Sequence, residues 1–378
     1  MQIDTDKIVE ECLNAIRDKI ANLATLNIIV AGKTGVGKST LINSVFREDI
    51  ADTGVGRPVT EHMRRITKKG FPLTMYDTKG FELNEDVQRQ VKGEVMETIR
   101  SGFSTNDISK AIHCIWYCVN ATSNRIEPEE IEWLRELGNE NLDTQVPIIV
   151  VLTQCLSQKK SKELQQVIEN ENLNVVQVIP VLAQDYEIDD EYTAKAFGLD
   201  NLIRVMSEAL PDELIVTLQH LQKVCLEEKR KMAQAVVAAE VTAAVAAGVA
   251  PIPVADCAVL IPAQVSMIAG ITAIYGMELN KSFLTAFISA ALGAGGATLL
   301  GKTVVSNILK LVPGAGSIAG GAISASTAGV ITAALGETYI LIMDQMFMGK
   351  ATAKDFQGKA GKERISMLFK EQLSISHS

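Results

Sequence analysis

A glycine-rich run, GKTGVGKST at residues 32–40, satisfies the pattern G-x-x-x-x-G-K-[ST]. The apolar run NIIVA precedes it and the helix-like run LINSVF follows it, which is the context in which this pattern binds phosphate. Glycines let the backbone curl until its N–H groups converge on a β-phosphate. Lys38 can then reach the β- and γ-phosphates, and Ser39 can offer its hydroxyl to Mg²⁺. We therefore predict a phosphate-binding loop at the N-terminus of a helix, whose dipole favours the anion.

A second motif, YDTKG at residues 76–80, ends the strand-like run LTMYD. Asp77 at the end of that strand can hold a magnesium-bound water, because carboxylate oxygen suits Mg²⁺. The backbone N–H of Gly80 can contact a γ-phosphate. The order and spacing of the two motifs predict a nucleotide switch.

Between the two motifs lies TGVGRPVTEHMRR, residues 53–65, which has the place and composition of a first switch loop. Thr60 is its expected ligand for Mg²⁺ and the γ-phosphate, and Thr53 is the alternative. The expected metal ligands of the whole site are Ser39, Thr60 and Asp77.

The stretches GKTGVGKST, RPVT and DTKG resemble the Era, septin and immunity-related branches of the P-loop GTPases over about residues 24–210. The resemblance implies a Ras-like, doubly wound domain that needs Mg²⁺ and hydrolyses a nucleoside triphosphate. It assigns phosphate, metal and switch roles to Lys38, Ser39, Thr60, Asp77 and Gly80.

Two features of the switch region bear on hydrolysis. Phe81 follows Gly80 where Ras-like enzymes carry the glutamine that orients water, so we expect slow turnover unless another group completes the site. Arg57 lies three residues before Thr60, the spacing at which Gα-type proteins keep an arginine in cis. We hypothesise that Arg57 stabilises transition-state charge; the alternative is a solvated arginine. The expected catalytic set is Lys38, Thr60, Gly80 and Arg57.

The stretch VVLTQCLSQKK, which begins at residue 150, stands where such a domain should recognise the base. Thr153 fits the Asn/Thr-Lys-x-Asp element, but Gln154 replaces the lysine and Leu156 replaces the aspartate. Leucine cannot accept the guanine N–H groups, so discrimination against adenine should weaken by roughly a few kcal/mol. Chloroplast import-receptor GTPases resemble this chain in carrying a degenerate element after Leu-Thr.

Three outcomes therefore stay open for the ligand: GTP and GDP, ATP or mixed use, or binding without turnover. Gln154, Ser157 or Gln158 could contact the base by another route, and VIPVLAQD matches the fifth element of these GTPases at Ala183 alone. The expected nucleotide contacts are Gly32, Lys33, Thr34, Gly35, Val36, Gly37, Lys38, Ser39, Thr40, Asp77, Thr153, Gln154 and Ala183.

Strand-like and helix-like segments alternate up to Pro211. The strand-like runs are LNIIVAG (26–32), PLTMYD (72–77), AIHCIWYCV (111–119), PIIVVLT (147–153) and VVQVIPV (175–181). Amphipathic segments separate them at 84–100, 127–137, 161–170 and 199–210. This alternation predicts a mostly parallel sheet covered on both faces. Ahead of it, residues 1–23 predict an amphipathic helix, with Ile8, Cys12, Ile16 and Ile20 spaced by four.

After Pro211 the strand signal ends, so we expect an α/β domain at 24–210 and an all-α domain at 211–378. Residues 212–235 predict one helix, and the chain beyond is rich in alanine and glycine. PIPVADCAVLIPAQVSMIAGITAIYG, residues 251–276, resembles a helical domain of unknown function in YcjF-type bacterial proteins, which implies membrane association. Gly316 and Gly320 form a GxxxG that favours close helix packing. A bundle that opens onto lipid, a permanently soluble bundle and a spanning domain are the three alternatives.

The net charge of −9 argues against a nucleic-acid partner. The N-terminal stretch is charged and has no apolar h-region, so we expect a cytoplasmic protein that associates conditionally with membranes. Expected partners are a guanine nucleotide, membrane lipid at residues 236–349 and further copies of the chain. One hypothesis is a GTPase whose nucleotide state controls membrane association or self-assembly. The other is a nucleotide-gated adaptor with negligible hydrolysis.

Overall fold

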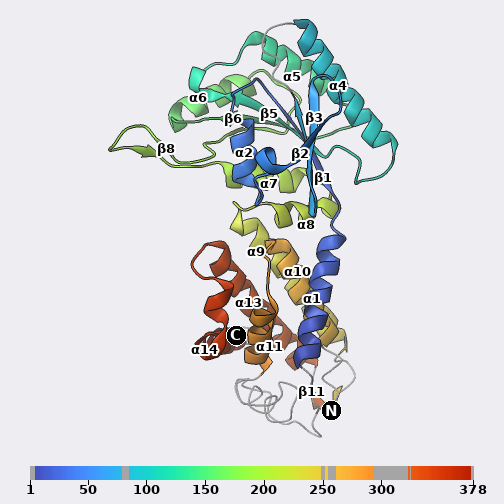
Figure 1. Cartoon of the computed structure of the whole chain (residues 1–378), viewed down its shortest axis with the longest axis vertical. Coiled ribbons are helices and arrows are strands. Elements are labelled where there is room, and N and C mark those ends of the chain that lie inside the picture. The colour runs from blue at the N-terminus through green and yellow to red at the C-terminus, as the bar shows by residue number, and fades with distance from the viewer. Residues whose placement is uncertain are drawn as a thin grey trace. The chain divides into compact units, whose positions relative to one another are not determined.

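The chain forms two compact units (Figure 1). The computed structural model describes residues 5–78, 85–247, 252–253, 261–292, 322–323 and 325–375. The sheet unit is Leu23–Cys225, and the helical unit combines Met1–Asn22 with Leu226–Ser378. Each unit has buried apolar residues of its own, so each is described by itself.

The sheet unit contains a seven-stranded sheet in the order β2-β3-β4-β1-β5-β6-β7. The strands are β1 (Leu26–Ala31), β2 (Val55–Pro58), β3 (Met63–Lys68), β4 (Phe71–Thr78), β5 (Cys114–Asn120), β6 (Ile148–Thr153) and β7 (Gln177–Pro180). From β4 to β7 the neighbouring strands run parallel, whereas β3 pairs antiparallel with β2 and β4. The expected doubly wound, mostly parallel sheet is confirmed.

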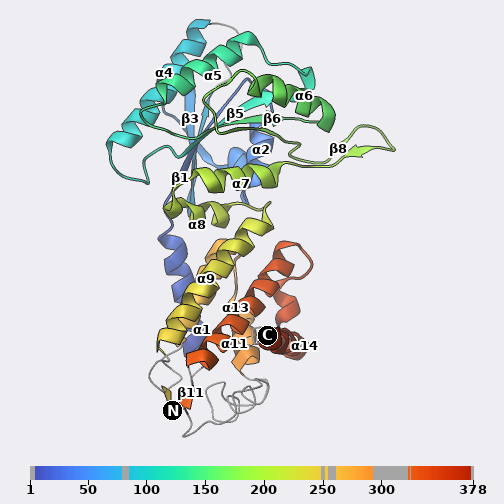
Figure 2. The same cartoon turned by 180° about the vertical axis from the view of Figure 1, so that it is seen from behind.

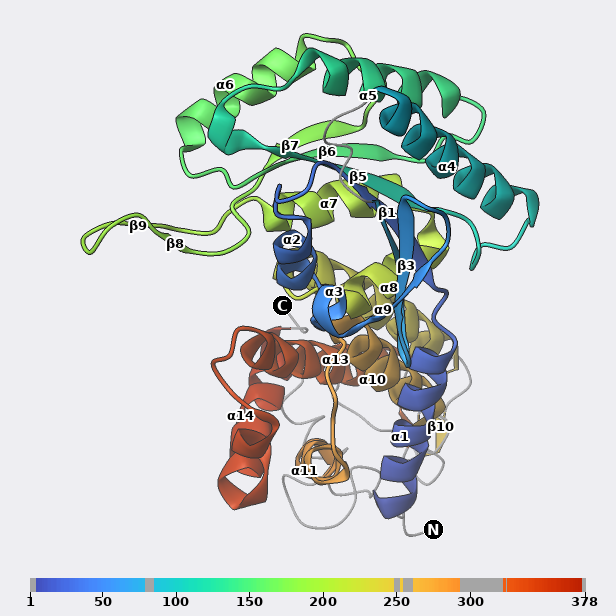
Figure 3. The same ribbon diagram turned by 45° about the horizontal axis from the view of Figure 1, so that its top comes forward.

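Helices cover both faces of this sheet (Figure 3). One layer is α4 (Glu85–Ser104), α5 (Pro128–Glu140) and α6 (Gln158–Glu169). The opposite layer is α2 (Lys38–Val45), α3 (Ile50–Thr53), α7 (Leu199–Ala209) and α8 (Asp212–Leu221). Along β1, Ile28 and Val30 join the core on the α7 side, and Ile29 and Ala31 join the core on the α4 side. Because both faces are buried, the strand is almost wholly apolar.

Part of the expected first switch loop is strand. Residues 55–58 form the exposed edge strand β2, and 63–68 form β3, whose Met63 and Ile66 are buried. Residues 59–62 connect them, with the N–H of Val59 donating to Met63 O at 2.9 Å. Buried apolar side chains and backbone pairing with β4 therefore order a stretch that its composition describes as a loop.

Three small elements complete the sheet unit. They are the 3₁₀ turn η1 (Ala121–Ser123) and the strands β8 (Tyr186–Glu187) and β9 (Thr193–Ala194). β8 and β9 pair as a hairpin that extends away from the sheet (Figure 1). An ion pair of 2.8 Å between Asp185 and Lys195 closes the base of the hairpin.

The single helix expected at 212–235 is wrong, because the chain breaks between α8 and α9 (Leu226–Ala247). The side-chain oxygen of Gln222 accepts the backbone N–H groups of Val224 and Cys225, at 2.7 and 2.8 Å. Its amide nitrogen donates to Cys225 O at 2.8 Å, which fixes a turn in place of helix. Leu214 and Leu218 of α8 pack in the sheet core, so the sheet unit runs to Cys225 instead of the expected 210.

The helical unit is built from long helices. With α9 they are α1 (Thr5–Ala21), α10 (Ile261–Tyr275), α11 (Lys281–Leu292), α13 (Ala325–Phe347) and α14 (Gly358–Ile375). Two-residue strands β10 (Ile252–Pro253) and β11 (Ala322–Ile323) pair antiparallel, and η3 (Ala353–Phe356) precedes α14. α9 lies along α13 (Figure 2), α1 packs on α10 and α11, and α14 packs on α11 and α13. The all-α character expected of this half is confirmed.

Helix α1 belongs to this unit and is not a separate appendage. Its buried side chains are Ile8, Val9, Cys12 and Ile16, which continue the four-residue spacing seen in the sequence. Lys281 of α11 donates to Glu10 at 2.7 Å across the same contact. The apolar stripe predicted for residues 1–23 thus meets α10 and α11.

Small residues bring α9 and α13 close together. A Cβ at Gly336 would lie 2.5 Å from Val237 Cγ2 and 2.9 Å from Met267 Sδ, so only glycine fits there. Within the described residues, one helix, Ala328–Phe347, is long and apolar enough to cross a membrane, and 56 % of it is buried in the protein. The predicted GxxxG of Gly316 and Gly320 lies outside the described residues.

Candidate nucleotide-binding site

The predicted phosphate loop connects β1 to α2. Gly32 has a φ of 137°, and a Cβ there would lie 2.4 Å from Cys118 O on β5. Gly37 has a φ of 96° and is the N-cap residue of α2. Glycine is therefore required at both ends of the turn, for close approach at the first position and for left-handed backbone at the second.

Lys38 points back into this loop. Its Nζ donates to the carbonyl oxygens of Gly32 at 2.8 Å and of Lys33 at 3.0 Å. The ammonium thus lies at the first turn of α2, where the helix dipole also favours an anion. Ser39 and Thr40 follow in that first turn with exposed side chains. The arrangement supplies a cation, the backbone N–H groups of a helix N-terminus and a hydroxyl, which are the groups that a polyphosphate with Mg²⁺ requires.

Asp77 lies opposite Val30 in the pairing of β4 with β1, near the same edge of the sheet as the loop. Its Oδ1 is buried and has no hydrogen-bond partner among the described residues, and its Oδ2 lies 3.8 Å from Arg64. Burial raises the pKa of this carboxyl, against the opposing charges of Lys38 and Arg64. A buried, unpartnered carboxylate oxygen beside a phosphate loop fits Mg²⁺, which prefers oxygen ligands and keeps several waters.

The base-recognition loop holds the phosphate loop from the other side. The Thr153 hydroxyl donates to Val36 O and lies 3.1 Å from Val119 O. Gln154 has a left-handed φ of 55°, and its Nε2 donates to Gly35 O at 3.1 Å. The amide of Gln154 therefore contacts the phosphate loop although the expected lysine is missing. Leu156 is half-buried and presents no acceptor.

Two family models match the chain, one over each half. Residues 27–154 match the family described as 50S ribosome-binding GTPase, and residues 216–377 match the Domain of unknown function (DUF697). The chain combines a P-loop GTPase domain with a helical domain of unknown function. The first match contains the phosphate loop and Asp77, and the second begins within α8.

The chain is also similar to septins over about half of its length. Human septin-12 is 25 % identical over 206 residues, which cover 48 % of this chain and 57 % of that protein. Septin-1 of Drosophila melanogaster is 22 % identical over 208 residues, 49 % of this chain and 55 % of that protein. This chain therefore spans just over half the length of these two septins.

Solved structures of two further proteins share weaker similarity. Cdc11 from Saccharomyces cerevisiae matches with 16 % identity and a TM-score of 0.31, over 49 % of this chain and 92 % of that chain. A dimerization-deficient mutant of Toc33 from Arabidopsis thaliana matches with 16 % identity and a TM-score of 0.31, over 55 % of this chain and 93 % of that chain.

In the switch region of the GTPase domain, Thr60 is held by a carboxylate that the sequence did not point to. The Thr60 hydroxyl donates to Glu94 Oε2 on α4, and His62 contacts the same carboxylate through its backbone N–H at 3.3 Å and its Nδ1 at 3.1 Å. Arg57 lies exposed on β2 opposite Arg65, and among the described residues it has no ion-pair partner. Gly80, Phe81 and the side chain of Thr53 lie outside the described part of the chain.

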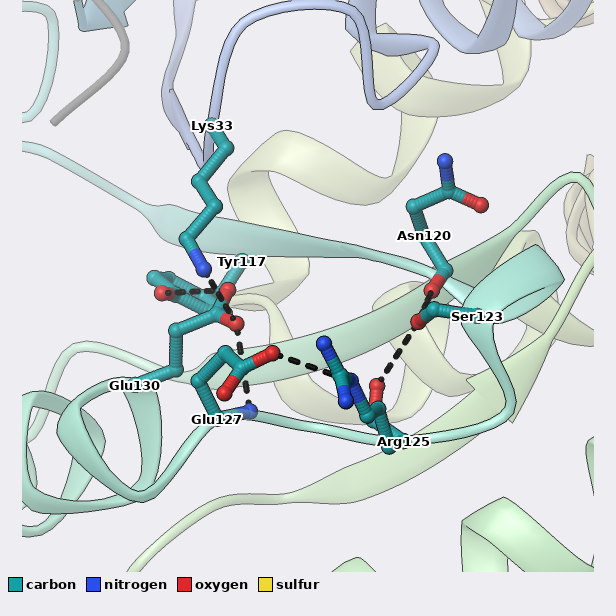
Figure 4. A network of polar contacts seen from close by, with 7 residues as sticks. All are labelled: Lys33, Tyr117, Asn120, Ser123, Arg125, Glu127 and Glu130. Carbon is teal, nitrogen blue, oxygen red and sulfur yellow. Dashed lines mark hydrogen bonds and ion pairs between the residues drawn. The ribbon is translucent and has the colours of Figure 1, made fainter. Parts of the chain in front are cut away.

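A second unforeseen carboxylate lies behind the phosphate loop (Figure 4). Glu130 of α5 pairs with Lys33 at 2.9 Å, and it accepts the Tyr117 hydroxyl at 3.4 Å. Burial and the nearby Glu130 raise the pKa of Tyr117 well above its usual range, so the phenol stays protonated and donates. The one sequence signal is Pro128 beside two glutamates, Glu127 and Glu130, which form a capping box at the start of α5.

The loop from β5 to α5 is fixed next to this pair by short polar contacts. Ser123 Oγ lies 3.3 Å from Asn120 O and 3.1 Å from Arg125 O, and Arg125 Nε lies 3.1 Å from Glu127 (Figure 4). Ala183 is partly buried and packs against the core on the α7 side of the sheet.

Proposed function

We propose that the GTPase domain binds GTP and GDP with Mg²⁺ and hydrolyses GTP slowly. The observation that carries the proposal is Lys38, whose ammonium is held by two loop carbonyls at a helix N-terminus, close to a buried carboxylate oxygen that the described residues leave without a partner. A lysine side chain alone would not indicate a nucleotide site, because lysines are common on protein surfaces. A cation, the backbone N–H groups of a helix N-terminus and an Asp77 oxygen with no partner among the described residues are together what a magnesium–polyphosphate ligand requires.

In this mechanism the chain mainly binds and orients. Lys38 would exchange its carbonyl contacts for phosphate oxygens, since an ammonium prefers an anion to a neutral acceptor. Ser39 and Asp77 would hold Mg²⁺, directly and through its water, and the metal would neutralise charge that develops on the phosphates. Thr60 must leave Glu94 before it can contact the metal or the γ-phosphate. We expect slow turnover because Phe81 offers no group that could orient water.

The residues expected to recognise the base decide whether the site prefers guanine to adenine. The contacts of Thr153 and Gln154 preserve the bracing of the phosphate loop, which supports nucleotide binding. Leu156 leaves guanine N–H groups without their usual acceptor, which favours the alternative of an NTPase that also accepts ATP. We propose GTP because the family that matches residues 27–154 is one of GTPases, and because septins are among the relatives of this chain.

For the helical unit we propose that nucleotide state controls its association with lipid or with further copies, in a cytoplasmic protein. The support is the candidate span Ala328–Phe347 and the likeness to septins. A nucleotide-gated adaptor without turnover remains the second candidate, favoured by the capture of Thr60 by Glu94.

The test is calorimetric titration of the full chain with GDP and with non-hydrolysable GTP and ATP analogues in Mg²⁺. We expect the guanine nucleotides to bind and Lys38→Ala to weaken them about a hundredfold, since a charge-assisted contact is lost. Lys110→Ala, which removes an exposed lysine paired with Asp107, is the matched control and should bind like the wild type. No binding of any nucleotide would overturn the proposal.

Leu156→Asp separates the two base preferences in the same titration. It should sharpen discrimination between guanine and adenine about tenfold, because it restores an acceptor for guanine N–H groups. Equal binding of the GTP and ATP analogues by the wild type, with preference appearing only in Leu156→Asp, would make the protein a relaxed NTPase. Phosphate release from GTP, measured with and without lipid vesicles, then distinguishes the GTPase from the adaptor.

A further inference from the structure

Glu130 is an ionisable side chain with only 6 % of its surface exposed, in the first turn of α5. Its Oε2 lies 2.9 Å from Lys33 Nζ and accepts the backbone N–H of Glu127 at 3.4 Å (Figure 4). Its Oε1 accepts the hydroxyl of Tyr117, a fully buried residue of β5. One carboxylate thus joins the phosphate loop, a central strand and a helix.

Lys33 carries this connection into the phosphate loop. Its side chain extends toward α5 and is 30 % exposed, whereas its backbone carbonyl accepts Lys38 Nζ at 3.0 Å. The carbonyl that holds the Lys38 ammonium therefore belongs to the residue that Glu130 anchors. Gly32 and Gly35 flank this stretch with positive φ values of 137° and 75°, so the loop backbone has little intrinsic preference of its own.

We propose that Glu130 is a positioning residue that sets nucleotide affinity by anchoring Lys33 and, through the Lys33 carbonyl, the phosphate loop around Lys38. The proposal rests on the proposed nucleotide-binding function and deepens it. Anchoring the loop before the ligand arrives removes part of the ordering cost of binding. The ion pair with the nearly buried Glu130 can hold Lys33 in place, because moving Lys33 away would leave the buried carboxylate without its counter-ion.

Two other roles for Glu130 make different predictions. Glu130 is half of the α5 capping box, so its loss could act through α5 alone and leave Lys33 irrelevant. Its negative charge could instead weaken phosphate binding by neutralising Lys33, in which case its removal would tighten binding. The three roles differ in the sign of the effect and in its dependence on Lys33.

The experiment is a double-mutant cycle with Glu130→Gln, Lys33→Met and both together, titrated with GDP in Mg²⁺ on the full chain. Each single variant should weaken GDP about tenfold, and the double variant should be no weaker than either single one, since both remove the same link. Glu132→Gln is the matched control, because Glu132 lies on the same helix in an exposed pair with Arg135. It should bind GDP like the wild type.

Hydrogen exchange of residues 33–37 without nucleotide gives a second readout that does not depend on binding. Exchange should quicken in Glu130→Gln and in Lys33→Met, and not in Glu132→Gln. If Glu130→Gln does not fold, Lys33→Met tests the same link from its more exposed end.

The outcomes separate the two proposals. Wild-type binding of GDP with unchanged affinity in Glu130→Gln and Lys33→Met overturns the positioning role alone. If Glu130→Gln lowers the affinity for GDP by the same factor in the Lys33→Met background as in the wild type, Glu130 acts by capping α5. If Glu130→Gln binds GDP more tightly than the wild type, Glu130 acts by neutralising Lys33. Failure of the wild type to bind any nucleotide removes the proposed function, and the affinity role of Glu130 with it.

Discussion

Two carboxylates, one in each unit, have opposite surroundings, because Asp344 is buried whole whereas Asp77 buries one of its oxygens. Asp344 of α13 is 2 % exposed, and both of its oxygens are used: Arg230 donates from Nε at 2.8 Å and from its Nη2, and Tyr275 donates its hydroxyl. Asp77 of β4 has one buried oxygen with no partner in the described part of the chain, and another 3.8 Å from Arg64. Burying a charge is costly unless it is paired. The described residues supply partners for both oxygens of Asp344 and leave one oxygen of Asp77 without any.

The difference separates a structural site from the proposed ligand site. A satisfied carboxylate fixes its neighbours, and Asp344 holds α9 and α10 to α13 through Arg230 and Tyr275. An unsatisfied carboxylate keeps bonding capacity for something that the chain does not supply. Glu94 belongs between these cases, because it is satisfied by Thr60 and His62, which belong to the predicted switch.

The largest effect should follow from breaking the satisfied case. Asp344→Ala leaves the Arg230 guanidinium and the buried Tyr275 hydroxyl without their acceptor, and should lower the free energy of unfolding by about 2–3 kcal/mol. We expect the low end of the range for buried pairs because the Arg230 side chain is 47 % exposed and can be hydrated. Urea unfolding of the full chain, with hydrogen exchange across residues 328–347 to assign the change to α13, measures it.

Glu371→Ala, which removes an exposed carboxylate from α14, is the control and should change the free energy by less than about 0.5 kcal/mol. If the helical unit opens onto lipid, Asp344→Ala should also raise the fraction of protein that sediments with anionic vesicles. Unchanged stability in Asp344→Ala would mean that the burial of this carboxylate has no structural consequence.

Asp77→Asn should act in the opposite way on stability. Removing a costly buried charge should raise the unfolding midpoint of the nucleotide-free chain, while the affinity for GDP in Mg²⁺ falls about tenfold, as it does when partners of metal-bound groups are removed. Calorimetry with Mg²⁺ and with EDTA separates the two effects: Mg²⁺ should strengthen GDP binding in the wild type and not in the variant. A variant that is less stable yet keeps its Mg²⁺ response would make Asp77 a structural residue.

The sequence predicted the parts of this site that depend on consecutive residues. The loop at 32–40 needs glycine at fixed intervals because its backbone takes positive φ values there. Asp77 stands at the end of an apolar run that the sequence shows to be a strand. Glu130 and Glu94 were missed because their partners lie 97 and 34 residues away, and no local pattern specifies such a pairing. The β2 strand was missed for a related reason, because an exposed edge strand carries no apolar alternation.

Helix boundaries show the same limit. The break after α8 depends on Gln222, whose side chain bonds to two backbone N–H groups ahead of it, and glutamine is an ordinary helix-forming residue. Because of that break, the boundary between the two units lies after Cys225 and not at the expected residue 210. Apolar periodicity identified α8 correctly as a helix, but it could not say which of two cores the helix would join.

The smallest effect should come from a substitution of Glu94. In the proposed function, the hydrogen bond from Thr60 to Glu94 must break when the γ-phosphate binds. Glu94→Ala removes the acceptor of the Thr60 hydroxyl and should favour the non-hydrolysable GTP analogue over GDP by about threefold, since the cost of one net hydrogen bond is no longer incurred on binding. GDP does not need Thr60 at a γ-phosphate, so its affinity should stay near the wild-type value. Calorimetric titration of both nucleotides measures the ratio.

Glu97→Ala removes an exposed carboxylate one turn along α4 and should leave the ratio unchanged. Thr60→Val in the Glu94→Ala background tests whether the freed Thr60 hydroxyl contacts the nucleotide. If it does, this second substitution should abolish the gained preference for the GTP analogue over GDP. If Glu94→Ala instead weakened both nucleotides equally, Glu94 would be a second structural carboxylate like Asp344. The switch threonine would then have to be sought elsewhere in residues 53–65.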